Sequence, residues 1–210
     1  MIFHPEVLSD SQGAILPSLG AFARAHGFYL GGGTAVALHL GHRKSVDFDW
    51  FARGEIADPL VLAGQARDQG LSVENTQIAP GTLHASVGGV RVSFFEYPYA
   101  EIGKPASWGE SSVDVASLDD LACMKLAAIA QRGSRKDFID LYFIALEHRP
   151  IAEIVTLYQR KYDTQDVVPV LMGLGYFEDA DEEPSPVMIR EAPWDQIKRE
   201  LEKWQRSLTA

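Results

Sequence analysis

Two aspartates, Asp47 and Asp49, are separated by a single residue in a segment that alternates acidic and apolar side chains. On a β-strand, residues two apart project from the same face, so the two carboxylates would lie side by side. Hard divalent cations such as Mg²⁺ prefer oxygen ligands of this kind and can bridge the phosphates of a nucleotide. The pair therefore predicts a Mg²⁺ site, and a strand end exposed to solvent is the alternative interpretation.

A glycine-rich turn, residues 31–33, comes shortly before the two aspartates and directly after a short apolar run. Glycines allow backbone N–H groups to approach a phosphate closely where a helix begins. We therefore expect Gly32, Gly33 and the hydroxyl of Thr34 to bind a triphosphate. The same residues are also compatible with a sharp turn followed by an N-cap, and both interpretations can hold together.

The segment that leads into the aspartates carries a cation and a hydroxyl, Arg43 and Ser45. A guanidinium at this place could steer a nucleotide or an RNA acceptor by its charge. The hydroxyl of Ser45 could donate a hydrogen bond to a phosphate oxygen, and a loop hydroxyl without such a role is the equal alternative.

A second group of polar residues occupies the C-terminal half, with Lys125 on one expected helix and Lys136, Asp137 and Asp140 on the next. Each also has an ordinary structural explanation. Lys125 would be a surface lysine, Asp137 a first-turn acid that complements the helix dipole, and Lys136 with Asp140 an i,i+4 surface ion pair.

Hydrophobic periodicity divides the chain into the elements that would position these residues. Helices are expected over residues 10–26, 34–40, 56–69, 117–133, from 135 onward, 151–162, 166–174 and 194–207, and strands over 28–30, 46–51, 71–78, 83–87 and 90–95. Pro17 places the expected start of the first helix near Leu16. Gly88-Gly89 predicts a hairpin, and residues 98–114 are expected to be a loop. The pattern predicts an α/β (α+β) fold, with a mixed core over 1–112 and a helical region over 113–210 packed on it.

The composition bounds the class of protein. The 210 residues are 46% hydrophobic and 23% charged, as in an ordinary globular protein. A net charge of −10 argues against a protein that coats nucleic acid non-specifically. The single cysteine, Cys123, excludes an intrachain disulfide and a cysteine zinc cluster, which is typical of a cytoplasmic protein. We find neither an apolar run long enough to span a membrane nor an N-terminal secretory signal.

Two motifs occur in a fixed order along the chain: Gly32-Gly33-Thr34 followed by Asp47-Phe48-Asp49, and Lys125 followed by Lys136-Asp137-Phe138-Ile139-Asp140. In this they resemble the AbiEii/AbiGii-type nucleotidyltransferases, a branch of the polymerase-β-like nucleotidyltransferase superfamily that includes toxins of toxin–antitoxin systems. The pattern of that family is a hydrophobic strand, a glycine pair, a helix, Asp-x-Asp and then a Lys…Lys-Asp-x-x-Asp segment. The resemblance extends from about Phe28 to Phe177.

The resemblance implies a nucleotidyltransferase-type mixed sheet with flanking helices and a Mg²⁺-dependent reaction. A nucleoside monophosphate would pass from an NTP to a hydroxyl of an RNA, such as tRNA, or of a protein. Asp47 and Asp49 would hold the metal, and Lys136 would join the nucleotide-binding residues. Lys125 would meet the γ-phosphate, and Asp140 would either orient Lys125 or act as a base toward the acceptor hydroxyl. A cognate antitoxin protein would be a further partner.

One position departs from the superfamily pattern, in which a third carboxylate on a later strand completes the metal site. Ser93 stands at the corresponding position here. Glu96 is the nearest carboxylate, but three residues on it points to the opposite face of a strand unless a bulge re-aims it. Two further hypotheses therefore accompany the transferase: a nucleotide-binding or partner-binding protein that has lost catalysis, and a metal-dependent phosphohydrolase.

Overall fold

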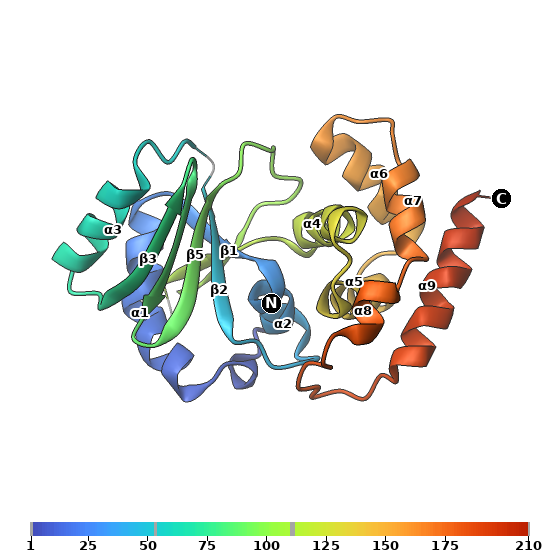
Figure 1. The fold of residues 1–210 in the computed structure, drawn as a ribbon, viewed down its shortest axis with the longest axis horizontal. Coiled ribbons are helices and arrows are strands. Elements are labelled where there is room, and N and C mark those ends of the chain that lie inside the picture. Colours follow the sequence, from blue (N-terminus) through green and yellow to red (C-terminus); the bar gives the residue numbers. More distant parts are fainter. Residues whose placement is uncertain (1, 53, 110–111, 210) are drawn as a thin grey trace.

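A seven-stranded mixed sheet forms one side of the molecule in the computed structural model, which describes residues 2–52, 54–109 and 112–209 (Figure 1). Its strands are β1 (Phe28–Gly31), β2 (Asp47–Ala52), β3 (Val73–Ala79), β4 (Thr82–Val87), β5 (Val90–Glu96), β6 (Ala106–Trp108) and β7 (Val113–Val115). They lie in the order β3-β4-β5-β2-β1-β7-β6. The central strand β2 pairs antiparallel with β1 and parallel with β5. The mixed α/β fold predicted from the sequence is confirmed.

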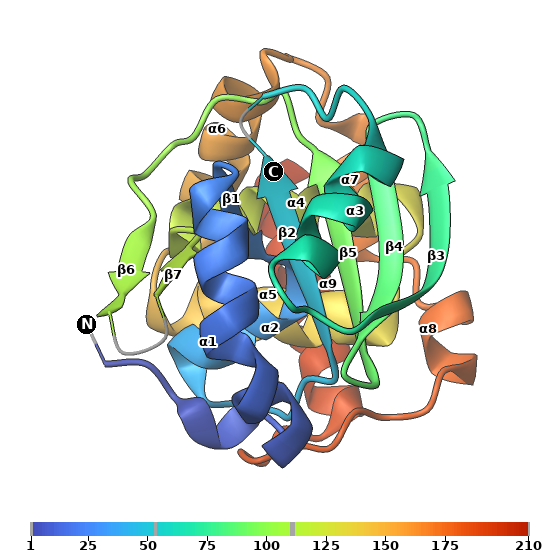
Figure 2. The same cartoon turned by 90° about the vertical axis from the view of Figure 1, so that its left-hand side faces the viewer.

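Helices lie on both faces of this sheet, and further helices pack beyond those of one face. They are η1 (Pro5–Val7), α1 (Asp10–Ala25), α2 (Gly32–Leu40), α3 (Pro59–Asp68), α4 (Leu118–Gln131), α5 (Arg135–Glu147), α6 (Ile151–Tyr162), α7 (Val168–Leu174), α8 (Glu178–Glu182) and α9 (Trp194–Thr209). Figure 2 shows α1 and α3 side by side over one face. On the other face, α2 packs against β1 and β2 and also contacts α4 and α5, so it joins the sheet to the helical region (Figure 1).

The first helix begins earlier than predicted. Ser9 accepts a hydrogen bond from the backbone N–H of Gln12, and the Gln12 side chain accepts one from the backbone N–H of Ser9, which forms a capping box. This cap starts α1 at Asp10, and Pro17 lies inside the helix. The prediction of a start near Leu16 was wrong because the cap and the tertiary packing outweigh the missing N–H of one proline.

The hairpin predicted at Gly88-Gly89 is confirmed. Both glycines have positive φ, +55° and +80°, as a two-residue turn between β4 and β5 requires. By contrast, the expectation of a loop over 98–114 was wrong, because β6 and β7 begin within it. Each has only three residues, too few for a period-2 pattern to stand out. β7 pairs with β1 in the sheet, although it lies beyond residue 112, where the helical region was predicted to begin.

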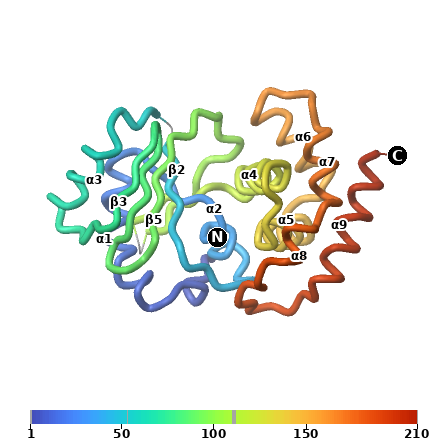
Figure 3. Tube along the Cα trace, viewed as in Figure 1, coloured from blue at the N-terminus to red at the C-terminus, as the bar shows by residue number. Residues whose placement is uncertain are grey.

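The chain between α8 and α9 returns from the helical region to the sheet side (Figure 3). There the backbone N–H of Lys44 donates to the carbonyl of Val187 at 2.8 Å, and Arg43 forms an isolated antiparallel bridge with Met188. These contacts fix the segment that connects α2 to β2. Among the helices of the described ranges, none combines the length and the apolar character needed to span a bilayer.

Candidate active site

The glycine turn and the two aspartates meet at the centre of the sheet. Gly31 at the end of β1 lies directly opposite Asp49 on β2. Gly32 begins α2 with φ of +61°, and a Cβ atom at this position would lie only 2.5 Å from Oδ2 of Asp49. A side chain is therefore excluded on both conformational and steric grounds, and the bare backbone lies against the carboxylate.

Asp47 and Asp49, together called the acid pair, share one face of β2. They are partly exposed, whereas Phe48 and Trp50 between and after them are fully buried on the other face. Within the described residues neither carboxylate forms an ion pair with a cation at 4.0 Å or less. Burial raises the pKa of Asp49, and the like charge of Asp47 raises it further. The acid pair is thus an arrangement that an added cation would stabilise.

A cavity of about 690 Å³ opens in front of the acid pair, between the sheet and helices α4, α5 and α6. Gly32 and Gly33 line it beside the acids. Three cations line its helical side: Lys125 on α4, Arg132 just after α4, and Lys136 in the first turn of α5. The cavity therefore has carboxylates on one wall and positive charge on the other, which suits a metal ion with a polyphosphate.

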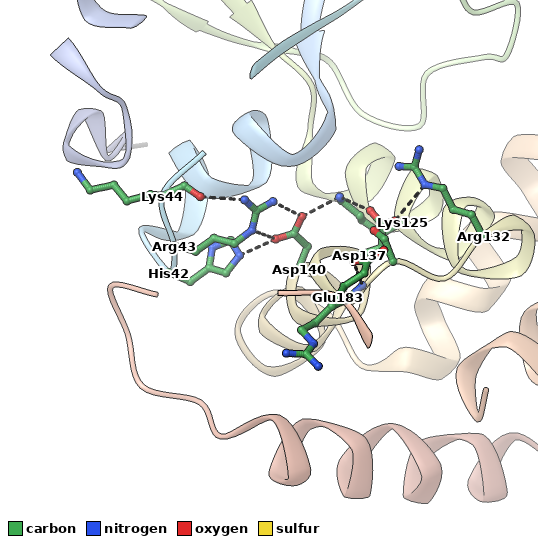
Figure 4. Close-up of polar contacts among 10 residues, drawn as sticks. His42, Arg43, Lys44, Lys125, Arg132, Asp137, Asp140 and Glu183 are labelled. Carbon is green, nitrogen blue, oxygen red and sulfur yellow. Dashed lines mark hydrogen bonds and ion pairs between the residues drawn. The ribbon is translucent and has the colours of Figure 1, made fainter. Parts of the chain in front are cut away.

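A buried cluster of ionisable residues adjoins this cationic wall and shares Lys125 with it: His42, Arg43, Lys125, Asp137 and Asp140. Figure 4 shows Asp140 between Arg43 and His42 on one side and Lys125 on the other. Arg43 donates from Nε and Nη2 to the two oxygens of Asp140 at 2.7 and 2.8 Å. His42 Nε2 lies 2.7 Å from Oδ1, and Lys125 Nζ lies 2.7 Å from Oδ2. The Asp140 carboxylate is therefore surrounded by three basic side chains, which bring four nitrogen atoms to it.

Electrostatics keep the two aspartates and Lys125 of the buried cluster ionised. Burial alone would raise the pKa of Asp140, but the charges of Arg43 and Lys125 outweigh it and hold that pKa well below its ordinary value. Lys125 also contacts Asp137 Oδ1 at 2.7 Å, and both aspartates raise its pKa against the effect of burial. Burial lowers the pKa of His42, although Asp140 acts in the opposite direction. This cluster ties the α2–β2 connection to α4 and α5.

The structure separates the predicted site residues into two groups. Those that line the cavity are Gly32, Gly33, Asp47, Asp49, Lys125 and Lys136. The other group, Thr34, Arg43, Ser45 and Asp140, is buried and lies outside the lining. The Thr34 hydroxyl contacts the Ser45 hydroxyl at 2.6 Å and donates to the carbonyl of Asp47, so it holds the start of β2. The surface ion pair considered for Lys136 and Asp140 is wrong, because Asp140 is fully buried among other cations.

Ser93, on β5, lies directly opposite Asp49 of β2, at the position where a third carboxylate was expected. The pairing of β2 with β5 continues without a shift as far as Glu96. No bulge therefore turns the Glu96 side chain toward the cavity. Glu96 Oε2 instead accepts a hydrogen bond from the backbone N–H of Ile56, on the opposite face. The nearest carboxylate therefore does not complete the acid pair.

The sequence reasoning missed two features of the cavity. One is His84 on β4, which lies directly opposite Ser93. The other is a group of tyrosines, which line the cavity near α6: Tyr97, Tyr99, Tyr158 and Tyr162. The hydroxyls of Tyr97 and Tyr162 lie 2.6 Å apart. The available signals were the alternation through β4 and the i,i+4 spacing of Tyr158 and Tyr162, which puts them on one helix face.

The acid pair fits a hard divalent cation. Two adjacent carboxylates that form no ion pair with any described residue supply the oxygen ligands that Mg²⁺ prefers. Mg²⁺ commonly takes only one or two carboxylates together with substrate phosphates and water. Across residues 2–52, 54–109 and 112–209 there is no cluster of three or more His, Cys, Asp or Glu side chains that could hold a metal. A bound ion would therefore take its remaining ligands from the nucleotide and solvent.

A second cavity, of about 820 Å³, lies on the opposite face of the sheet near α1 and α3. Its charged lining includes Arg24, Asp58 and Asp114, but neither the acid pair nor the glycine turn reaches it. The chemistry predicted from the sequence therefore converges on the cavity beside α4.

Several known proteins are similar to this chain in sequence or in fold. An uncharacterized protein of Aquifex aeolicus is 36% identical over 177 residues, which cover 84% of this chain and 86% of that protein. The fold is similar to JHP933 of Helicobacter pylori, with a TM-score of 0.59 and 15% identity over 96% of this chain and 93% of that one. It is also similar to MenT4, a nucleotidyltransferase toxin of Mycobacterium tuberculosis, with a TM-score of 0.53 and 13% identity over 94% of this chain and 83% of that one.

The structural likenesses, at identities this low, show the fold. The family assignment comes from the sequence, because residues 14–207 match the model of the family described as nucleotidyl transferase AbiEii toxin, type IV toxin–antitoxin system. The glycine turn, the acid pair and the cationic wall all lie within the matched range. The chain is therefore a member of the AbiEii family of nucleotidyltransferase toxins.

Proposed function

We propose that this protein is a Mg²⁺-dependent enzyme that transfers a nucleoside monophosphate from an NTP to a hydroxyl of an RNA, such as tRNA, or of a protein. The observation that carries the proposal is the acid pair, which faces the cavity beside the glycine turn without a cationic partner in the described residues. An ion-paired aspartate would have to lose its partner before it could bind a metal, whereas these two are available as they stand.

Different walls of the cavity would bind different parts of the Mg²⁺-NTP complex. Asp47 and Asp49 would hold Mg²⁺, which neutralises phosphate charge when bound. Backbone N–H groups at the start of α2, beside Gly32 and Gly33, would donate to phosphate oxygens. Arg132 and Lys136 would attract the far end of the triphosphate from the helical wall.

Lys125 is not free to move toward a phosphate, because two aspartates hold its ammonium group. Its ammonium lines the cavity but is held by Asp137 and Asp140 at 2.7 Å each. Held in this way, it places a fixed positive charge behind the phosphates at no further cost of reorganisation. Of the two roles considered for Asp140, the contacts support the orientation of Lys125, because a fully buried carboxylate outside the cavity has no path to an acceptor hydroxyl.

The test is incubation of the protein with each labelled NTP, Mg²⁺ and total tRNA. Label on RNA or on protein supports transfer and identifies the acceptor class. Asp47→Asn with Asp49→Asn should reduce transfer at least about 10³-fold, since positioning and charge neutralisation are both lost. Asp114→Asn, an aspartate of the same sheet outside this cavity, is the matched control and should keep full activity.

Ser93 supports a second candidate function, a nucleotide-binding protein without turnover, because the acid expected at its position is absent. Saturable Mg²⁺-NTP binding without any transfer would favour this candidate. Release of free phosphate would instead favour the phosphohydrolase. Family membership adds a cognate antitoxin to the proposed partners. Arrest of growth on expression of this chain, relieved by co-expression of a candidate antitoxin, would test it.

A further inference from the structure

Three polar side chains lie abreast on the cavity face of three neighbouring strands, which Figure 2 shows side by side. His84 on β4 pairs in register with Ser93 on β5, and Ser93 pairs in register with Asp49 on β2. Residues that lie directly opposite one another across strands project from the same face. All three side chains line the cavity.

Hydrogen bonds connect this row. The Nδ1 atom of His84 lies 3.0 Å from Oγ of Ser93, and Ser93 lies directly opposite Asp49, whose pKa its side chain lowers by hydrogen bonding. An ionised carboxylate can only accept, so the Ser93 hydroxyl donates to Asp49 and its oxygen accepts from His84. This direction requires the proton of the imidazole on Nδ1 and leaves a lone pair on Nε2, and the tautomer measurement described below tests it. In the part of the chain that the structure describes, Nε2 has no hydrogen-bond partner.

We infer that His84 is a catalytic residue, the general base that activates the acceptor hydroxyl. This rests on the proposed transferase function. As the acceptor oxygen forms its bond to the α-phosphorus, its proton moves to Nε2 of His84. The bond from the α-phosphorus to the oxygen that bridges to the β-phosphorus breaks, and its electron pair leaves with pyrophosphate. The imidazolium then returns its proton to water, which reaches the exposed ring.

The other titratable groups of the cavity are less suited to this step. Asp47 and Asp49 are assigned to the metal. Asp137 accepts from Lys125 and from the Ser134 hydroxyl, at 2.7 and 2.6 Å. The hydroxyls of Tyr97 and Tyr162 are raised in pKa by burial, so they do not ionise at neutral pH. Histidine is the side chain most often used as a general base.

The neighbours of His84 keep its ring in place. The ring contacts Phe95 in an edge-to-face arrangement, with 5.5 Å between centroids, while Ser93 holds Nδ1. Ser93 thus serves as a positioning residue. It occupies the place of a third carboxylate and connects the imidazole to Asp49, so that the base and the metal ligands have a fixed relation.

The decisive experiment measures single-turnover transfer together with NTP binding for His84→Ala and His84→Gln. A general base contributes about 10²–10⁴-fold, so both variants should lose that much rate while the dissociation constant for Mg²⁺-NTP stays within about twofold. Added imidazole should restore part of the rate of His84→Ala, because it can enter the space left by the ring. His148→Ala removes an imidazole that contacts Asp119 outside the cavity and should behave as wild type.

A readout independent of activity is the tautomer of His84. Long-range ¹H–¹⁵N spectra of the protein should show the Nδ1–H form in wild type and its loss in Ser93→Ala. If the wild-type protein transfers label and His84→Ala does so at the same rate, the role of His84 is overturned and the proposed function is not. A loss of rate that imidazole does not restore and that accompanies weakened NTP binding would also overturn the role of His84. Absence of transfer by the wild-type protein would overturn the proposed function itself.

Discussion

Two pairs of aspartates, Asp47 with Asp49 on β2 and Asp137 with Asp140 on α5, have opposite surroundings. The first pair faces the cavity without a cation at ion-pair distance in the described residues, and the pKa of Asp49 is raised. The second pair is fully buried, and the pKa of each carboxyl is lowered despite that burial. The carboxylates on β2 thus lack a neighbouring cation at ion-pair distance in the described residues, whereas those on α5 are paired with cations.

The difference separates function from architecture. A carboxylate that its own protein has neutralised contributes to the folded state and has little capacity left for a ligand. A carboxylate that folding leaves desolvated and next to a like charge costs free energy until a ligand arrives. The comparison therefore predicts that substitutions in the two pairs affect stability with opposite signs.

The largest effect on stability is expected for Asp140→Ala. Removal of this carboxylate leaves Arg43 buried without its partner and weakens the contact that holds Lys125. Breaking a buried charge network in this way costs about 3–5 kcal/mol of unfolding free energy. For a chain of this size the melting temperature should fall by roughly 10 °C.

Asp119→Ala is the matched control for Asp140→Ala. Asp119 also accepts hydrogen bonds from an arginine and a histidine, Arg149 and His148, but all three side chains are partly exposed to solvent. Its loss should cost less than about 1 kcal/mol. Equal losses for the two variants, measured by urea unfolding, would show that burial does not distinguish the clusters.

The contrast between the two pairs also indicates what the sequence could predict. Asp47, Asp49 and the glycine turn are close in the chain, so strand alternation and turn chemistry were enough to bring them together. The bond between Arg43 and Asp140 spans 97 positions, and no local pattern reports it. Arg43 was therefore expected to bind a nucleotide, although it is the structural partner of Asp140.

The position of His84 was available from the sequence but was not used. A two-residue turn at Gly88-Gly89 fixes the register of the hairpin, and counting outward from it pairs Val87 with Val90 and His84 with Ser93. The relation of β5 to β2, by contrast, is a parallel pairing across a long connection, and its register depends on tertiary packing. The sequence could therefore predict that His84 lies opposite Ser93, but not that Ser93 lies opposite Asp49.

A smaller effect should follow acidification, which acts on the buried cluster through His42. Burial lowers the pKa of His42 in the folded protein, so below about pH 6.5 the unfolded chain binds a proton that the folded one does not. Stability from this source is complete above pH 6.5 and decreases as the pH falls, by at most about 1.4 kcal/mol per unit. His39, also lowered by burial, acts in the same direction.

The measurement is the unfolding free energy of wild type and His42→Gln at intervals from pH 7.5 to 5. The variant should be less stable at pH 7.5, since the contact to Asp140 is altered, but should lose stability more slowly on acidification. His148→Gln, at the surface, should follow the wild-type slope. Parallel curves for wild type and His42→Gln would contradict the role given to burial of this imidazole.

The smallest effect, and the one of opposite sign, is expected for Asp49→Asn. The folded protein holds the pKa of Asp49 above its unfolded value, so at neutral pH the ionised carboxylate lowers stability. Asparagine keeps the shape, can still accept the hydrogen bond from Ser93 and removes the repulsion with Asp47. We expect a gain on the order of 0.5 kcal/mol in metal-free buffer, together with loss of transfer.

Mg²⁺ with NTP should reverse that order of stability. Ligand that binds only the folded state stabilises by RT ln(1 + [L]/Kd), about 2.7 kcal/mol at 100 times Kd. Wild type should gain this and overtake Asp49→Asn, whose site has lost a ligand charge. If Asp49→Asn were instead destabilised in metal-free buffer, the acid pair would belong with Asp137 and Asp140 as part of the architecture. The raised pKa of an unpaired carboxylate would then be no guide to the place where this fold does its chemistry.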